Sequence, residues 1–371
     1  MGLRIAHIAS DKMLTTFSPA LRCASIRCRL SSLKNHSAQD ASHLSPDQPQ
    51  APHQPIDVDQ ALTAAMQHQS AGQYAQAERL YRSVLEVVPN HPIALQLLGV
   101  LAHMAGQSET GLQLIRAAIT VAPDYVAAHN NLGNVLREMG QLAEAADAYR
   151  DALRLKPDYA EALGNLGLTL QGLDQLEQAI THYRAALKIK PKLVDTLNNL
   201  GNALCQLKDL DAAVESFEKA LALQPDYAEA HFNLGMALKL QGNIEEAIDR
   251  LAKAVELRPD DAVTHNCLGL ALQRFGRLDE AALCYQQALR IHQDKADYHF
   301  NLANVLELQG RLKVALAGYR KALELDPQFA EAAGSIGSVL LALGEPEEGQ
   351  EKERQGFGVI SFDLKKGVSF D

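Results

Sequence analysis

Prolines recur in this sequence at a fixed spacing of 34 residues. They stand at positions 89, 123, 157, 191, 225 and 259, Gln293 takes the next place, and Pro327 resumes the series. Self-similarity at a period of about 20 to 50 residues indicates a repeat architecture. If each proline is position 32 of a repeat, eight repeats fill residues 58–329 and a degenerate ninth repeat follows. The nine repeats begin at Val58, Pro92, Val126, Ala160, Val194, Ala228, Ala262, Ala296 and Ala330.

Each repeat carries the signals of two packed helices. Positions 8 and 20 hold only Ala or Gly in every repeat, which lets two helix backbones approach closely. Position 24 is mostly Tyr or Phe and supplies a bulky side chain between the helices. Gly at position 15 of six repeats lies where a first helix must end, because Gly tolerates a left-handed backbone. The proline at position 32 ends a second helix.

This pattern resembles the tetratricopeptide repeat (TPR) family, whose repeat is a helix–turn–helix of 34 residues. The resemblance covers residues 58–329 without insertion and continues into the ninth repeat. It implies an all-α fold, a right-handed TPR superhelical solenoid. In such a solenoid the first helix of every repeat lines the concave surface through positions 2, 5, 6, 9, 12 and 13.

The N-terminal segment, residues 1–57, differs in composition from the repeats. Residues 1–36 are rich in Arg and Ser and poor in acid, as in a mitochondrial transit peptide. The alternatives are an unstructured tail, which we favour, and a translation start assigned too far upstream. Residues 37–56 form a Ser/Gln/Pro/Asp linker without periodicity, so we expect residues 1–57 to be disordered.

The C-terminal segment also departs from the repeat. Residues 330–356 begin as a ninth repeat and become strongly charged, which predicts a capping helix that shields the last apolar face. Residues 357–371 place two short apolar runs around Gly367, and this pattern predicts a hairpin. The hairpin could dock a partner strand or begin a further domain, and we favour its folding back on the last repeat.

Charge and cysteine content exclude several classes of function. The whole chain carries a net charge of −10, and residues 58–371 alone carry −12, whereas sequence-independent phosphate binding needs a basic face. No apolar run reaches the length of about 20 residues that spans a bilayer. Five scattered cysteines fit a reducing compartment. We therefore expect no nucleic acid partner, no membrane span and a cytoplasmic location, with an organelle as the alternative if residues 1–36 are a targeting signal.

Histidine recurs at position 4 of four repeats, and three of these repeats are consecutive. Equivalent residues of neighbouring repeats lie about one helix packing distance apart, roughly 10 Å, whereas Zn–N bonds are about 2 Å long. The histidines cannot share one ion, and we expect them to be half-buried between helices. The four residues are His129, His231, His265 and His299. We expect neither a metal site nor a cofactor.

Asparagine recurs on the helix face that the resemblance assigns to the groove, although Asn has a poor helix propensity. A carboxamide offers both a donor and an acceptor, so a row of amides could pair with the main chain of an extended peptide. Acids at position 2 favour a neutral or basic peptide. Position 6 supplies Asn131, Asn165, Asn199, Asn233 and Asn301, and position 9 supplies Asn134, Asn202 and Asn304. Position 5 adds Asn130, Asn198 and Asn266, and position 2 supplies Glu161, Asp195, Glu229, Asp297 and Glu331.

The asparagine row resembles the TPR arm of O-linked N-acetylglucosamine transferases, where asparagines and nearby aspartates hold the substrate polypeptide. The resemblance carries over to the five position-6 asparagines, with Asp195 and Asp297 as the matching aspartates, and Cys267 interrupts the row. The alternative is that Asn-Leu-Gly is simply a common TPR consensus. A glycosyltransferase domain needs well over 100 residues, but only 41 follow residue 330, and no nucleotide-binding or hydrolase motif occurs. We therefore expect no enzyme activity.

A second known mode of TPR binding is the two-carboxylate clamp of co-chaperones, which pairs asparagines with Lys or Arg. Position 5 of the relevant repeats carries Asn130 or Asn198 instead of a cation. Without cations the carboxylates would lose their charge-assisted hydrogen bonds, so we exclude this mode. The sequence predicts an adaptor or scaffold that binds an extended peptide. The alternatives are the targeting arm of an O-linked glycosylation system with a separate transferase chain, and a scaffold that self-associates through its C-terminal segment.

Overall fold

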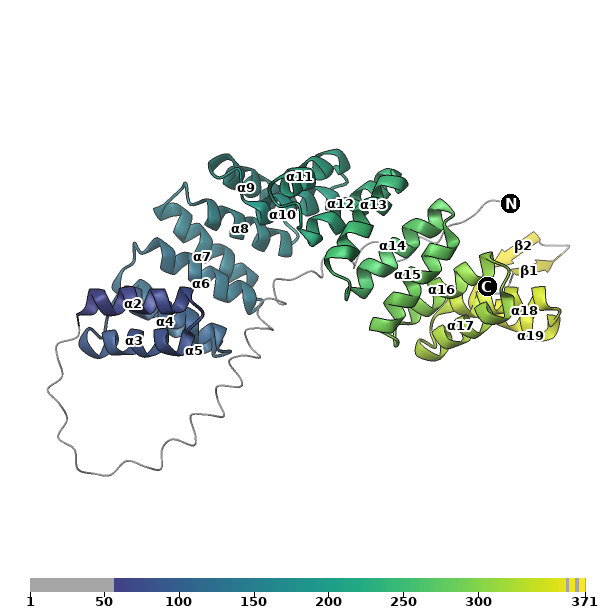
Figure 1. Cartoon of the computed structure of the whole chain (residues 1–371), viewed down its shortest axis with the longest axis horizontal. Helices are drawn as coiled ribbons and strands as arrows, with labels where there is room; N and C mark the ends of the chain where they lie inside the picture. Colours follow the sequence, from purple (N-terminus) through teal and green to yellow (C-terminus); the bar gives the residue numbers. More distant parts are fainter. Residues whose placement is uncertain (1–56, 358–359, 364–366, 371) are drawn as a thin grey trace, which may run out of the picture. The chain divides into compact units, whose positions relative to one another are not determined.

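The computed structural model describes residues 57–357, 360–363 and 367–370 (Figure 1). The expectations for residues 1–56, namely a tail, linker or targeting signal, lie outside the described residues. Contacts divide the chain into two compact units, residues 1–203 and residues 204–371, and the division falls within helix α10. We call them the N-terminal unit and the C-terminal unit and describe each by itself.

The described residues form eighteen helices and two short strands, and the helices alternate between a first (A) and a second (B) helix of each repeat. The A helices are α2 (Val58–Ser70), α4 (Pro92–Met104), α6 (Val126–Glu138), α8 (Ala160–Gly172), α10 (Val194–Gln206), α12 (Ala228–Gln241), α14 (Ala262–Phe275), α16 (Ala296–Leu308) and α18 (Ala330–Leu343). The B helices are α3 (Tyr74–Val87), α5 (Ser108–Val121), α7 (Leu142–Leu155), α9 (Leu176–Ile189), α11 (Leu210–Leu223), α13 (Ile244–Leu257), α15 (Leu278–Ile291), α17 (Leu312–Leu325) and α19 (Pro346–Phe357).

Consecutive helices pack against each other from α2 to α9 in the N-terminal unit and from α11 to α19 in the C-terminal unit, and some A helices of successive repeats also touch, as α6 and α8 do. The expected all-α solenoid of two-helix repeats is therefore confirmed. Its core consists of small residues that allow close contact and of large side chains that fill the space between helices. The largest fully buried side chains include the position-24 residues Tyr81, Tyr149, Tyr183, Phe217, Tyr285 and Tyr319.

The small residue at position 8 is required by the aromatic residue at position 24. A Cβ atom added to Gly133 would lie 2.6 Å from Cε1 of the Tyr149 ring, closer than real side-chain contacts allow. The A helix can therefore lie against the face of the tyrosine only if position 8 carries almost no side chain. This contact explains why position 8 is Gly or Ala in every repeat.

The turn between the A and B helices requires a left-handed residue. Gly140 has a φ of 79°, and the six other glycines of the A–B turns, from Gly72 to Gly344, have similar positive values. Two repeats place a larger residue at the same point, Asp174 with a φ of 59° and Lys208 with a φ of 64°. The turn geometry is therefore kept even where the residue is unfavourable for it.

The position-4 histidines bind the polypeptide that precedes their own helix. In each case Nε2–H donates a hydrogen bond to the carbonyl oxygen six residues earlier, over 2.9 Å from His129 to Pro123 and 2.8 Å from His231 to Pro225. His265 bonds Pro259, and His299 bonds Gln293, in the same way. The histidines thus satisfy the carbonyl at position 32 of the previous repeat. Among the described residues, no three His, Cys, Asp or Glu side chains are grouped to hold a metal ion.

At the C-terminal end, α18 and α19 pack closely, and strands β1 (Ile360–Asp363) and β2 (Gly367–Phe370) follow. The strands pair in antiparallel orientation, with Ile360 opposite Phe370 and Phe362 opposite Val368. Residues 358–359, 364–366 and 371 of the predicted C-terminal segment lie outside the described residues. In the part of the chain that the structure describes, no helix is both long enough and apolar enough to cross a membrane.

Candidate peptide-binding site

The asparagines predicted to bind a peptide all lie on A helices. In the N-terminal unit, α6 carries Asn131 and Asn134, α8 carries Asn165, and α10 carries Asn199 and Asn202. Residues three, four or seven apart share one face of a helix, so positions 2, 6 and 9 of a repeat align along that face. All five side chains are half-buried.

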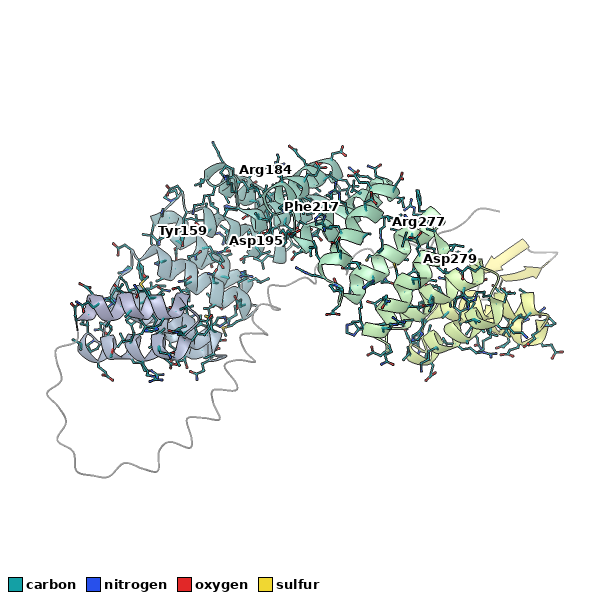
Figure 2. All side chains as sticks on the ribbon, in the orientation of Figure 1. Tyr159, Arg184, Asp195, Phe217, Arg277 and Asp279 are labelled. Carbon is teal, nitrogen blue, oxygen red and sulfur yellow. The ribbon has the colours of Figure 1, made fainter. Side chains whose placement is uncertain are left out.

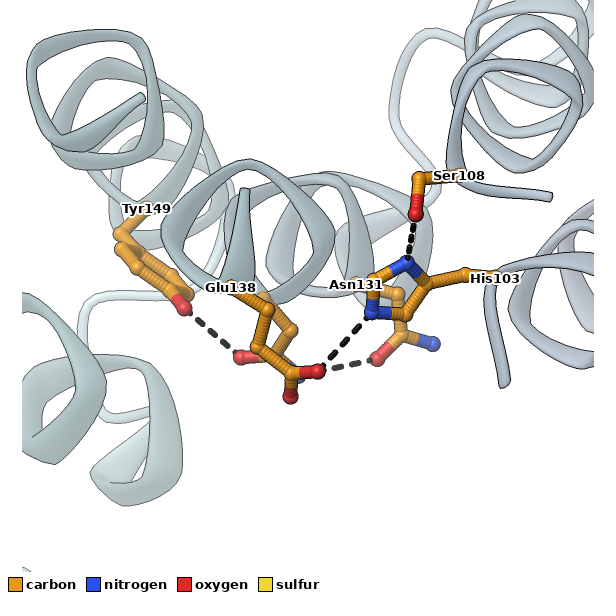
Figure 3. Close-up of polar contacts among 6 residues, drawn as sticks. His103, Ser108, Asn131, Glu138 and Tyr149 are labelled. Atoms are coloured by element: carbon orange, nitrogen blue, oxygen red, sulfur yellow. Dashed lines mark hydrogen bonds and ion pairs between the residues drawn. The ribbon is translucent and has the colours of Figure 1, made fainter. Parts of the chain in front are cut away.

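Three of these amides form one hydrogen-bonded network. Nδ2 of Asn165 donates to Oδ1 of Asn134 over 3.1 Å and to Oδ1 of Asn130 over 3.4 Å. Nδ2 of Asn134 donates to Oδ1 of Asn131 over 3.4 Å. The hydroxyl of Tyr149 donates to Oδ1 of Asn134 over 2.7 Å (Figure 3). The structure therefore brings Asn131, Asn134 and Asn165 together through contacts across two neighbouring repeats.

The network determines which half of each amide can face a ligand. The amide nitrogen of Asn165 is occupied by Asn130 and Asn134, and its Oδ1 has no hydrogen-bond partner among the described residues. Asn131 is the reverse, because its Oδ1 accepts from Asn134 and its Nδ2 has no partner within the described part of the chain. These two neighbouring repeats thus present opposite groups, a donor from Asn131 and an acceptor from Asn165.

This result differs from the expectation that every position-6 amide offers both groups. The structure also places the position-5 asparagines Asn130 and Asn266 outside the candidate site. Asn130 is only 6% exposed and Asn266 only 3% exposed, so both are buried acceptors for a neighbouring repeat. Positions 5 and 6 point about 100° apart on a helix, and only the packing of adjacent repeats decides which of them is covered.

Asn199 and Asn202 lie on α10, outside the hydrogen-bonded network. No described residue forms a hydrogen bond with either side chain. Asp195, one turn earlier on the same helix, is exposed (Figure 2). Glu161 at the equivalent position of α8 forms an ion pair of 2.5 Å with Lys190, whose hydrogen bond lowers the pKa of that carboxyl. The acidic column is therefore partly neutralised by the protein itself.

The C-terminal unit repeats part of this arrangement. Nδ2 of Asn301 donates to Oδ1 of Asn266 over 2.9 Å, and the hydroxyl of Tyr319 donates to Oδ1 of Asn304 over 2.6 Å. Asp297 is exposed and lies one turn before Asn301 on α16. Asn233 on α12 is buried, with 8% of its surface exposed. Cys267, which interrupts the row, is 2% exposed, and burial raises the pKa of its thiol.

Sequence reasoning missed the tyrosine hydroxyls. The position-24 ring acts as a bulky core side chain, but its hydroxyl also reaches a polar residue at position 9 or 12 of its own repeat. Burial raises the pKa of Tyr81 and of Tyr149 to about 12, so both stay neutral donors. The sequence does contain a signal for these hydrogen bonds, because five of the six aromatic residues at position 24 are Tyr, which has a hydroxyl, rather than Phe. Tyr81 bonds Gln69, Tyr183 bonds Gln171, Tyr285 bonds Gln273, and Tyr319 also bonds Glu307.

Comparisons with known proteins agree with this architecture. Models of the tetratricopeptide repeat match residues 193–260, 228–294, 62–127 and 268–330, and a model of the TPR repeat matches residues 133–174 and 173–207. No curated protein matches the chain.

Several solved structures are similar over about half of the chain. The MamA protein is 26% identical, over 47% of this chain and 94% of its own, with a TM-score of 0.42. YrrB, described as a TPR protein with an unusual peptide-binding site, is 23% identical over 50% of this chain and 95% of its own, with a TM-score of 0.43. PilF of Pseudomonas aeruginosa is 20% identical over 54% of this chain and 92% of its own, with a TM-score of 0.49. The repeat matches together span most of residues 62–330, and the chain belongs to the tetratricopeptide repeat family.

Proposed function

We propose that this protein is an adaptor that binds an extended peptide along the A-helix asparagines of its N-terminal unit. The observation that carries the proposal is the pair of neighbouring position-6 amides that present opposite groups. Asn131 presents amide N–H groups and Asn165 presents Oδ1, and both side chains are half-buried and lack described partners for these groups. A partly buried polar group without a partner costs free energy, and a ligand that supplies the missing partner recovers it.

The main chain of an extended peptide is the matching ligand. It presents N–H and C=O groups alternately, so a carbonyl can accept from Asn131 while an N–H donates to Asn165. The chemistry does not depend on the side chains of the peptide. The exposed carboxylate of Asp195 nearby favours a neutral or basic segment over an acidic one.

The proposal is tested with a displayed library of random peptides selected on the full chain. For a selected peptide, methylation of the single backbone nitrogen that faces Asn165 should weaken binding about tenfold or more, since it removes one hydrogen bond and adds bulk. The variant Asn131→Ala/Asn165→Ala should lose binding to the same peptide. Arg184→Ala, an exposed change on α9 (Figure 2), is the matched control and should bind normally. Equal binding by the asparagine variant and the wild type would refute the proposal.

The targeting arm of an O-linked glycosylation system remains the second candidate. The recurrence of asparagine at position 6, with Asp195 and Asp297 one turn earlier, is the observation that favours it. Its test is a glycosylation assay with a separate transferase chain, in which added wild-type protein but not the asparagine variant should increase transfer to a protein substrate. Self-association through the C-terminal strands is tested by sedimentation at increasing concentration, with and without residues 357–371.

The described cysteines support a reducing location. Cys205, Cys267 and Cys284 are free thiols, and Cys205 and Cys267 are buried. Burial raises the pKa of Cys205 and Cys284 to about 11, so these thiols stay protonated and react slowly. We propose a cytoplasmic location, which keeps these thiols reduced. Fractionation of cells that express the full chain tests this assignment.

A further inference from the structure

Three side chains from successive helices form a hydrogen-bonded chain in the N-terminal unit. His103 lies in the last turn of α4, Ser108 is the first residue of α5, and Glu138 is the last residue of α6. Nδ1 of His103 lies 2.9 Å from Oγ of Ser108, and Nε2 lies 2.9 Å from Oε2 of Glu138 (Figure 3). None of the three belongs to the asparagines of the proposed peptide site.

The order of these contacts fixes the direction of the hydrogen bonds. A carboxylate only accepts, so Nε2 of His103 carries the proton that binds Glu138. In the neutral ring, which carries a single N–H, Nδ1 then holds the lone pair and accepts the hydroxyl proton of Ser108. A hydroxyl bonded to a base, whose tautomer is held by a third group, is the arrangement that activates a serine as a nucleophile.

The three side chains of this hydrogen-bonded chain differ in their exposure to solvent. The side chain of His103 is 11% exposed and that of Glu138 is 38% exposed, so the ring is shielded from competing water. Ser108 is half-buried, and its neighbours Gln107 and Glu109 are exposed. A small reagent can therefore reach the hydroxyl while the base stays in place.

Backbone amides beside Ser108 are placed to receive negative charge. The N–H groups of Ser108, Glu109 and Thr110 donate to no group among the described residues, and Gln107 makes no side-chain cap. Such amides and the positive end of the helix dipole stabilise an oxyanion that forms next to the serine. The carboxylate of Glu138 lies beside the His103 ring, and Glu109 follows Ser108 in the sequence, so negative charge in this region favours uncharged reagents over anionic ones.

We propose that Ser108 is an acylation site that accepts an acyl group from an uncharged, activated carboxylic ester. Oγ attacks the ester carbonyl and its proton passes to Nδ1 of His103. The bond from the carbonyl carbon to the leaving oxygen then breaks, and the proton moves from His103 to the departing alcohol. The products are acyl-Ser108 and a free alcohol. His103 is the base, and Glu138 is a positioning residue that holds the ring.

The experiment uses the folded full chain and p-nitrophenyl acetate, with acetylated residues located by mass spectrometry. Ser70 is the internal control, because it lies at a helix end in the same unit and its hydroxyl donates to the backbone carbonyl of Gln67 instead of a base. General base assistance contributes about 10²-fold or more, so Ser108 should be acetylated at least tenfold faster than Ser70. Equal rates at the two serines in the wild type would overturn the proposal.

Substitutions test whether these side chains take part in the reaction or only in packing. The melting curve of each variant is first compared with that of the wild type. Ser108→Ala should remove the fast release of p-nitrophenolate. His103→Ala should slow acetylation of Ser108 at least tenfold and leave acetylation of Ser70 in the same molecule unchanged, which a general loss of packing would not produce. Glu138→Gln should slow the reaction and remove the low-field imidazole N–H resonance that its bond to His103 produces. Acetylation of Ser108 at the wild-type rate in His103→Ala would also overturn the proposal.

Discussion

The hydroxyl of Tyr149 lies 2.7 Å from Oδ1 of Asn134 and fixes that amide from inside the repeat. The tyrosine ring is fully buried, so its single polar atom must find a partner within the protein. Because Asn134 in turn contacts Asn131 and Asn165, a core residue of the B helix determines how the amides of the A helices are oriented.

Tyr149→Phe should therefore affect stability and binding separately. The ring and its packing remain, and the loss of one buried hydrogen bond should lower the free energy of unfolding by about 1 kcal/mol. The amide of Asn134 is then free to rotate, and the affinity for a selected peptide should fall several-fold. Urea denaturation measures the first effect and peptide titration the second. Tyr81→Phe, whose hydroxyl bonds Gln69 on α2, is a control that should change stability alone.

Gly133→Ala should destabilise the N-terminal unit, although Ala65 and Ala303 occupy the equivalent position opposite Tyr81 and Tyr319 in repeats whose helices are spaced for a methyl group. A Cβ at this position would meet the Tyr149 ring at 2.6 Å, and overpacking of a close-packed core costs about 1–3 kcal/mol. Gly164→Ala on α8 is the matched control, because its nearest neighbour would be Oγ1 of Thr196 at 3.1 Å. There the gain in helix propensity, about 1 kcal/mol, should offset most of the strain. The two midpoints of thermal unfolding should differ clearly, and equal midpoints would contradict the packing argument.

The two non-glycine turns predict stabilising substitutions. Lys208 has a φ of 64°, a backbone conformation that costs a residue with a Cβ atom roughly 1–2 kcal/mol. Lys208→Gly removes that cost and adds flexibility to the unfolded chain, so a net gain of about 0.5 kcal/mol is expected. Asp174→Gly should gain less, because Asp tolerates this conformation better. Gly140→Ala is the reverse change, and calorimetry should show it to be destabilising.

Acid should weaken the C-terminal unit through His231. Burial lowers the pKa of this histidine below its ordinary value of 6.5, and Nδ1 is buried without a hydrogen-bond partner in the described structure. The unfolded chain therefore binds this proton more readily than the folded chain, so stability is full above pH 6.5 and declines as the pH falls below it. Urea midpoints measured between pH 7.5 and 5.5 should show the decline.

His231→Gln tests the source of this pH dependence. Its amide can still donate to the carbonyl of Pro225, but it does not titrate. The variant should lose part of the decline below pH 6.5. The carboxyl of Glu161, whose pKa is lowered by Lys190, acts in a separate window below its ordinary value of 4.5. An unchanged pH profile in the variant would exclude His231 as the cause.

The sequence was sufficient to predict the parts of the fold that depend on local geometry and on side-chain size. The left-handed turn at Gly140 is marked by Gly in most repeats, and the small residue at Gly133 has a Gly or Ala equivalent in every repeat. The orientation of amides could not be predicted in the same way. Asn130 and Asn131 are adjacent in sequence and chemically identical, yet one is a buried acceptor and the other half-buried. Only the packing of α6 against α8 decides between them.

The bond from Asn165 to Asn130 joins residues 35 positions apart, one more than the length of a repeat. This hydrogen bond therefore requires two adjacent repeats, but it does not require one particular pair of repeats. If the coding sequence for residues 160–193 were lost in frame, Asn199 would become the neighbour of Asn130, and the same bond could form again. An array built this way can grow or shorten by whole modules during evolution while its internal amide contacts are preserved.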